Sequence, residues 1–193
     1  MARHGDTRQK IVEAADTLFY EQGVGASSFA DIAGAVGLSR GNFYHHFQSK
    51  DAILEAVIER RLTRTREMLA QWQRDGGTPR DRIVSFVQML IANRAKIMAF
   101  GCPVGTLSTE LAKLDHIAAP RAAEVFTLFL DWLEAQFQAA GFVPDRARAL
   151  AHHAMMLAQG IATLAAAFKD ETQLRQDVDD FTGWLDETLS SKG

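Results

Sequence analysis

The clearest chemical pattern in this 193-residue chain is a polar face between Gly37 and Lys50. The segment holds Arg40, Lys50 and two histidines, and it contains no carboxylate. Cationic and hydrogen-bonding side chains without a competing carboxylate are suited to phosphate groups. The segment therefore predicts an anionic partner, although the whole chain has a net charge of −3. The outward positions are expected to be Arg40, Gly41, Asn42, Tyr44, His45 and His46.

Two short helices joined by a tight turn are expected to position this polar face. Ser28, followed three residues later by Asp31, predicts a capping box at the start of the first helix. Gly37 is suited to the left-handed conformation that ends this helix, and Ser39 is suited to cap the second. The aromatic residues expected in the core are Phe19, Phe29, Phe43 and Phe47. A short helix held against another, with a polar outer face, has the shape of a helix-turn-helix DNA reader.

The order of these residues resembles the N-terminal domain of the TetR family of bacterial transcriptional repressors. The matching positions are Ile32-Ala33, Gly37, Ser39, Gly41, Tyr44-His45-His46-Phe47 and Ser49-Lys50. Apolar, glycine and aromatic positions agree together over roughly residues 7–57, which disfavours the alternative of an unrelated helical hairpin.

This resemblance implies a set of DNA contacts. The implied residues are Ser28, Ser39, Arg40, Gly41, Asn42, Tyr44, His45 and Lys50. Among them, the side chains of Arg40 and Asn42 suit base edges. Those of Ser28, Tyr44 and Lys50 suit phosphates.

The remainder of the chain is expected to be helical as well, giving an all-α fold. Only four prolines occur, and long stretches are rich in Ala, Leu, Arg, Gln and Glu. The resemblance implies a helix-turn-helix DNA-binding domain over residues 1–50 and a helical effector-binding and dimerisation domain over 51–193. Residues 1–6 are expected to form a mobile arm. The expected helices beyond the helix-turn-helix cover about 7–22, 49–73, 79–100, 106–114, 120–140, 144–168 and 171–190.

Two surfaces of these later helices need interpretation. The basic cluster of Arg60, Arg61, Arg64 and Arg66 is expected to be a solvated helix face, not a DNA contact. The helix from Pro144 is apolar on more sides than one neighbour covers. Its small residues, which permit close helix approach, are Ala158, Gly160, Ala162, Ala165 and Ala166. These features predict a homodimer through helices 145–168 and 171–190, the alternative being a wholly intramolecular core.

The second half contains one local motif. Its residues 101–111, GCPVGTLSTEL, resemble the LmrA/YxaF-like subgroup of the TetR family. The family resemblance implies a small-molecule effector, and inward-facing apolar side chains predict a largely apolar, aromatic one. The expected ligand-binding residues are Phe86, Met89, Leu90, Cys102, Phe126, Phe129, His152 and Met155. The alternative is that the apolar members of this set simply fill the core.

Cys102 admits other roles. It lies between Gly101 and Pro103 near a helix start, where a thiolate gains some stabilisation, so a thiol-based electrophile or redox sensor is an alternative. Yet no Lys, Arg or His adjoins it in the sequence, and buried free cysteines are usually inert. A DNA-binding regulator without a small-molecule effector is a further alternative.

Several classes of function are disfavoured. The sequence contains no glycine-rich phosphate loop, no metal-ligand cluster and no nucleophile with a recognisable base, so we expect neither an enzyme nor a cofactor or metal. No apolar run approaches the ~20 residues of a membrane span. The N-terminus lacks a signal peptide's apolar core, and the single cysteine permits no intramolecular disulfide. These features predict a cytoplasmic repressor that binds a near-palindromic double-stranded operator as a homodimer and is released by its effector.

Overall fold

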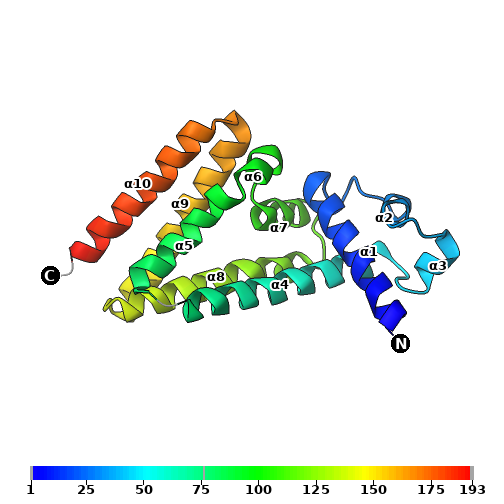
Figure 1. Ribbon diagram of the computed structural model, residues 1–193, viewed down its shortest axis with the longest axis horizontal. Coiled ribbons are helices and arrows are strands. Elements are labelled where there is room, and N and C mark those ends of the chain that lie inside the picture. The colour runs from blue at the N-terminus through cyan, green and yellow to red at the C-terminus, as the bar shows by residue number, and fades with distance from the viewer. Residues whose placement is uncertain (1, 76, 192–193) are drawn as a thin grey trace. The chain divides into compact units, whose positions relative to one another are not determined.

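The structure, a computed structural model, describes residues 2–75 and 77–191, with the backbone alone described at residues 2–5 and 40. Over these ranges the chain forms ten α-helices and no strand, which confirms the predicted all-α class (Figure 1). The helices are α1 (Ala2–Glu21), α2 (Phe29–Ala35), α3 (Arg40–Tyr44), α4 (Lys50–Arg74), α5 (Pro79–Ala92), α6 (Arg94–Phe100), α7 (Pro103–Lys113), α8 (Ala119–Ala139), α9 (Pro144–Phe168) and α10 (Glu171–Ser190).

Three helix boundaries differ from expectation. Helix α1 already begins at Ala2, so the backbone expected as a mobile arm is helical there. The helix expected over 79–100 is broken at Asn93, whose side-chain amide donates to the carbonyl oxygen of Met89 (2.9 Å) and so competes with the helical backbone pattern. Helix α7 begins at Pro103 because proline's fixed φ suits a first helical position.

The helices pack into two compact units. The first comprises residues 1–64 with 106–123, and the second comprises 65–105 with 124–193. Helices α4, α7 and α8 contribute residues to both units. The first unit therefore contains the predicted DNA-binding domain, 1–50, together with the start of α4 and most of α7.

The first unit is built around the side chains that the helix-turn-helix pattern predicted as core. Phe43 is fully buried, and Phe19 and Phe47 are each 3% exposed. The ring of Phe29 packs edge-on against that of Phe43, with centroids 4.5 Å apart. Burial confirms the core assignment of Phe19, Phe43 and Phe47, whereas Phe29 is half-buried.

Two arginines of α4 join it to α1. The guanidinium of Arg60 reaches Glu13 at 2.8 Å and Asp16 at 3.2 Å, and Nε of Arg61 reaches Asp16 at 2.7 Å. The side chains of Arg60, Arg61 and Asp16 are only 17%, 11% and 18% exposed. The prediction of a solvated face was therefore wrong for these two arginines, because their partners lie on a helix distant in sequence.

The second unit is a helical bundle in which α10 lies along α5 and α9, and α6 packs on α9 (Figure 1). Its core contains the rings of Phe86, Phe129 and Phe181, with Phe86 5.7 Å from Phe129 and 6.4 Å from Phe181 between centroids. The polar side chain of Gln136 is also buried there and accepts a hydrogen bond from Arg82 (3.3 Å).

In the described part of the chain, no single helix has the length and apolar character needed to cross a membrane. Only a bent pair, Pro79–Ala92 with Arg94–Lys113, meets these criteria jointly, across a 64° bend.

Candidate functional site

The helix-turn-helix begins with the capping box that the sequence predicts. The Ser28 hydroxyl accepts a hydrogen bond from the backbone N–H of Asp31 (3.1 Å), while the Ser28 N–H donates to the Asp31 carboxylate (2.8 Å). Hydrogen bonds from the Ser28 hydroxyl and backbone N–H hold the pKa of Asp31 below its ordinary value. Two of the amides at this helix start that have no partner within the helix are therefore satisfied locally.

The turn between α2 and α3 is formed as predicted. Gly37 has φ +65°, a conformation that costs glycine little, and the following Leu38 N–H donates to the carbonyl oxygen of Ala33 (3.1 Å). Ser39 then caps α3, its hydroxyl lying 3.5 Å from the Asn42 nitrogen that donates to it. The turn and both caps fix the start of α3.

The outer face of the helix-turn-helix is largely open. The predicted DNA-contact residues that are exposed are Ser28, Ser39, Gly41, Asn42, Tyr44 and His45. Tyr44 is 47% exposed, and its ring also lies 4.8 Å from that of Phe29. Arg40 opens α3, and its side chain lies outside the described residues.

Lys50 differs from the other predicted contacts because it is half-buried. Its ammonium group donates to the carbonyl oxygens of Val24 (2.9 Å) and Ser27 (3.3 Å). An ammonium group has three N–H donors, so one remains for an external anion. Lys50 thus stabilises the turn before α2.

Arg8 is a basic residue that the sequence analysis did not select. Its guanidinium carbon lies 4.6 Å from the centroid of the Phe47 ring, a cation–π arrangement that holds the side chain beside the helix-turn-helix. Arg8 is exposed, and no carboxylate among the described residues forms an ion pair with it. Lys10, by contrast, pairs with Asp6 at 2.8 Å. The Arg8–Phe47 contact gives no local sequence signal because it joins two segments far apart in the chain.

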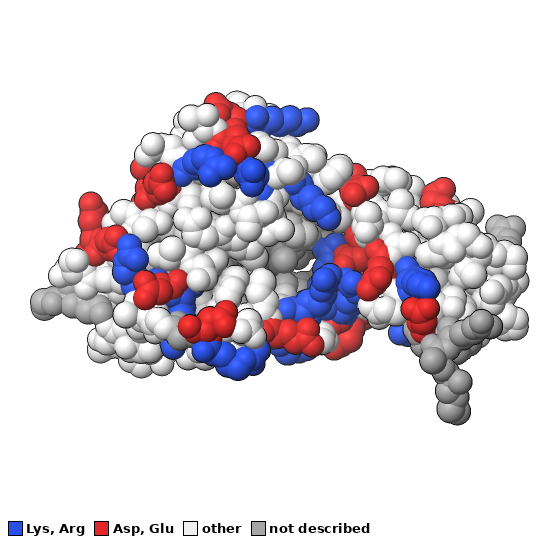
Figure 2. All heavy atoms as spheres, in the orientation of Figure 1, with Lys and Arg blue, Asp and Glu red and all other residues white. Residues whose placement is uncertain are grey.

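Charge is otherwise mixed. On the face drawn in Figure 2, basic and acidic side chains are intermingled. This distribution agrees with the net charge of −3. Because the overall charge does not attract an anion, binding of DNA would depend on the side chains of the helix-turn-helix itself.

The predicted ligand-binding residues differ in how deeply the fold buries them. Those buried in the second unit are Phe86, Leu90, Phe129 and Met155. Those that are half-buried are Met89, Cys102 and Phe126. His152 is exposed and is separated from this core, whereas the neighbouring His153 is half-buried, with its ring 4.8 Å from that of Trp184.

Gln159 brings two members of this set together. Its side-chain amide donates to the sulfur of Cys102 (3.4 Å) and lies 3.9 Å from that of Met155. Its oxygen would lie 2.6 Å from a Cβ at position 105, so Gly105 permits this close approach. Gln159 was missed in the sequence, although a single amide inside an apolar helical run was the available signal.

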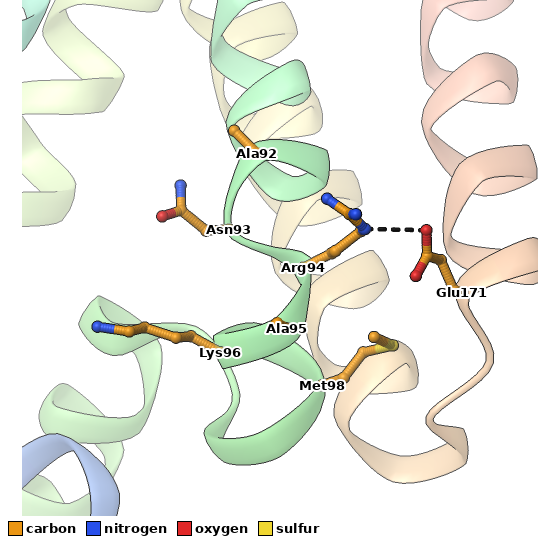
Figure 3. A pocket seen from close by; sticks show the side chains of 7 residues that line it. All are labelled: Ala92, Asn93, Arg94, Ala95, Lys96, Met98 and Glu171. Atoms are coloured by element: carbon orange, nitrogen blue, oxygen red, sulfur yellow. Dashed lines mark hydrogen bonds and ion pairs between the residues drawn. The ribbon is translucent and has the colours of Figure 1, made fainter.

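Two hollows on the surface of the second unit are lined by residues outside the predicted ligand-binding set. One, of about 290 Å³, lies at the break between α5 and α6, where Arg94 turns toward Glu171 (2.8 Å) while Asn93 and Lys96 turn the other way (Figure 3). The other, of about 390 Å³, follows α9 and α10. The residues lining this α9–α10 groove include His153, Met156, Gly160, Leu164, Asp177 and Trp184.

The fold and the capped helix-turn-helix define a class, all-helical proteins that carry a helix-turn-helix motif. Residues 11–57 match the family described as bacterial regulatory proteins, tetR family, and residues 79–179 match the transcriptional regulator LmrA/YxaF-like C-terminal domain. The chain belongs to the TetR family, with a C-terminal domain of the LmrA/YxaF-like type. Both predicted resemblances are confirmed, and the family is one of regulators and not of enzymes.

Individual relatives agree with this assignment. The chain is 27% identical to the transcriptional repressor DhaR of Mycobacterium sp. strain GP1 over 66% of its own length and 62% of that protein. It is 27% identical to the repressor NemR of Escherichia coli over 58% of its length and 57% of NemR. The chain thus aligns with about three-fifths of each relative.

Solved structures share the fold over nearly the whole chain. A TetR transcriptional regulator from Legionella pneumophila gives a TM-score of 0.81 at 23% identity, covering 93% of this chain and 95% of that one. The reduced form of E. coli NemR gives 0.75 at 20% identity, covering 91% and 95%.

Proposed function

We propose that this protein is a ligand-responsive transcriptional repressor that binds a near-palindromic operator as a homodimer. The observation that carries the proposal is the helix-turn-helix. Both of its helices have N-terminal caps and turn apolar side chains inward, while its outer polar side chains are exposed. Such a face enters the major groove in regulators of this architecture. We expect the protein to act in the cytoplasm, where bacterial operator DNA lies.

The proposed contacts divide by chemistry. Asn42 and Arg40 suit base edges, because their side chains can form paired hydrogen bonds with adenine and guanine. Ser28, Tyr44 and Lys50 suit phosphate oxygens, and Ser39, Gly41 and His45 complete the proposed face. Arg8, held over Phe47 without an ion-pair partner in the described chain, is an additional candidate for a phosphate contact.

A second copy of the chain is the proposed partner along helices 145–168 and 171–190. The support is an apolar surface on α9, where Met156 is 63%, Leu164 49% and Phe168 74% exposed. A two-fold pair of α9 and α10 would cover this surface as a four-helix interface. The same symmetry would present two identical readers, which is why the proposed operator is near-palindromic.

The proposed effector is a small, largely apolar molecule. The apolar side chains around Phe86 and Phe129 supply the chemistry for it, and the amide of Gln159 supplies a polar group beside Cys102. Since Phe86, Phe129 and Met155 are buried, an effector that contacts them would have to bind a more open conformation. It would release DNA only by binding that conformation more tightly than the DNA-binding one.

Two alternatives follow from the same site. A regulator without any effector would keep the closed core around Phe86 and Phe129 at all times. A thiol sensor would use Cys102, which is half-buried directly before Pro103 and contacts Gln159. A thiol sensor would lose its response to an electrophile such as iodoacetamide in the Cys102→Ser variant, whereas a regulator released by a non-covalent effector would keep its response to that effector.

The DNA-binding proposal is tested with duplexes that the wild-type protein selects from a randomised library. Fluorescence anisotropy should show binding that weakens as salt rises and a preference for the selected over a scrambled duplex. Asn42→Ala should reduce discrimination by about 1–3 kcal/mol at one position in each half-site. Lys113→Ala, a charge change on α7, is the control. Absence of any selected sequence would contradict the proposal.

A further inference from the structure

A carboxylate on α7 holds the turn that leads into the helix-turn-helix. Oε2 of Glu110 accepts a hydrogen bond from the backbone N–H of Val24 (2.9 Å), and Oε1 accepts one from the N–H of Gly25 (2.8 Å). Both distances are those of charge-assisted hydrogen bonds. Val24 is 3% exposed, so its N–H has little access to water as a replacement partner.

The turn is shaped to receive this carboxylate. Gly23 has φ +93°, and a Cβ at this position would lie 3.0 Å and 3.2 Å from the two oxygens of Glu110. A side chain here would therefore be strained in its backbone and would also displace the carboxylate. Glycine at this position permits both the turn and the contact.

The same turn is held from its carbonyl side. Lys50 donates to the carbonyl oxygens of Val24 and Ser27, and the hydroxyl of the buried Ser27 donates to the carbonyl oxygen of Gly23 (2.7 Å). Glu110 thus binds N–H groups of the turn while Lys50 binds its C=O groups. The next residue is Ser28, the N-cap of α2.

We infer that Glu110 is a positioning residue for DNA binding: it fixes the turn at residues 23–27 and thereby the direction in which α2 and α3 leave α1. This inference rests on the proposed DNA-binding function. Glu110 itself forms hydrogen bonds with the turn and is not one of the predicted DNA-contact residues. Small misplacements of a recognition element weaken every contact that it makes, so the effect on DNA affinity should exceed the effect on folding.

The test compares Glu110→Gln with wild type in the full-length protein. Glutamine keeps the size of glutamate, but its NH₂ group cannot accept, so one of the two amides is left without its acceptor. Amide hydrogen exchange measured by NMR should accelerate by about tenfold or more at Val24 or Gly25 and stay unchanged in α9. The Kd for the selected duplex should rise by about tenfold, while the slope of log Kd against log salt stays the same, because every phosphate remains bound by the same side chains.

Glu55→Gln is the matched control, since Glu55 is an exposed carboxylate of the first unit with the same charge change. Its DNA affinity and its Val24 and Gly25 exchange should equal those of wild type. Glu110→Asp, which keeps the charge but withdraws it by one methylene, should give an intermediate Kd. It replaces Glu110→Gln if that variant does not fold.

Each outcome decides a different statement. If the wild-type protein selects no duplex, the proposed function fails, while exchange at Val24 and Gly25 still reports on the hydrogen bonds of Glu110. If wild type binds and Glu110→Gln binds equally well although its amide protection is reduced, the positioning role is overturned. It is also overturned if affinity falls only in proportion to the unfolded fraction measured by circular dichroism.

Discussion

The surface proposed to bind a partner in the first unit is opposite in character to that in the second. In the first, the outward positions of the helix-turn-helix are polar, and the phenylalanines Phe43 and Phe47 are turned inward. In the second, α9 leaves Met156, Leu164 and Phe168 in contact with solvent. A polar open face suits a partner that is itself charged and hydrated, whereas an apolar open face suits burial against another apolar surface. The difference favours DNA as the partner of one unit and a second copy of the chain as the partner of the other.

Helix α9 shows that the residue pattern of a helix does not by itself reveal which side is exposed. Its small residues Ala158, Ala162 and Ala165 are buried inside the protomer, with Ala162 fully covered. The prediction that this small-residue set forms the dimer surface was therefore wrong for these three positions, whose role is close packing within the second unit. Gly160, by contrast, is exposed and lines the α9–α10 groove. The open apolar stripe, which includes Gly160, lies on the side of α9 opposite these three alanines.

The largest effect is expected from Ala162→Asp. This residue is fully buried, so the variant should place an unpaired charge in the core at a cost of several kcal/mol and should fail to fold cooperatively. Leu164→Asp, at a 49% exposed position, should instead fold and elute as a monomer with little remaining operator affinity. Leu164→Met is the control. Circular dichroism and size-exclusion chromatography distinguish the cases, and a dimeric Leu164→Asp would contradict the proposed interface.

A smaller effect is expected from Phe129→Trp in the aromatic core. Phe129 is 5% exposed, and its ring lies 5.7 Å from that of Phe86. The larger indole should overpack this site and cost about 1–3 kcal/mol of unfolding free energy, measured by urea denaturation. Unchanged stability together with a weakened effector response would show instead that the site contains an adaptable cavity.

Arg8→Ala tests the proposed DNA-binding surface of the first unit. If Arg8 binds one phosphate per protomer, the variant should bind all duplexes more weakly and reduce the salt slope by about 1 for each phosphate that it no longer neutralises. Lys10→Ala is the matched control, because the ammonium group of Lys10 is paired with Asp6. An unchanged salt slope in Arg8→Ala would remove Arg8 from the interface.

The smallest effect is expected at the capping box. Because the folded-state pKa of Asp31 is lowered, its stabilisation is complete above the unfolded-state pKa of about 3.9 and is lost as the pH falls through the lower folded-state value. The difference in Tm between wild type and Asp31→Asn should therefore be present near neutral pH and shrink on acidification to about pH 3. A difference that does not change with pH would show that Asp31 acts without its charge.

The helix-turn-helix was predictable because its determinants are local. A cap and its partner three residues later, a glycine at a helix end, and two aromatic residues four apart each act over a single turn of chain. The capping box at Ser28, the left-handed Gly37 and the buried Phe43 and Phe47 all appear in the structure as the sequence indicated. The family resemblance drew on the same positions.

The sequence by itself thus determined the all-α class, the family and the start of each reading helix, since helix propensity, capping and periodicity are properties of neighbouring residues. Only the tertiary structure decided which side of α9 is open, that Arg60 and Arg61 pair with α1, that Gln159 meets Cys102, and that Glu110 holds the turn before α2. These contacts join residues far apart in the chain. Their formation depends on the packing of whole helices, so the local sequence pattern does not identify the partner of each residue.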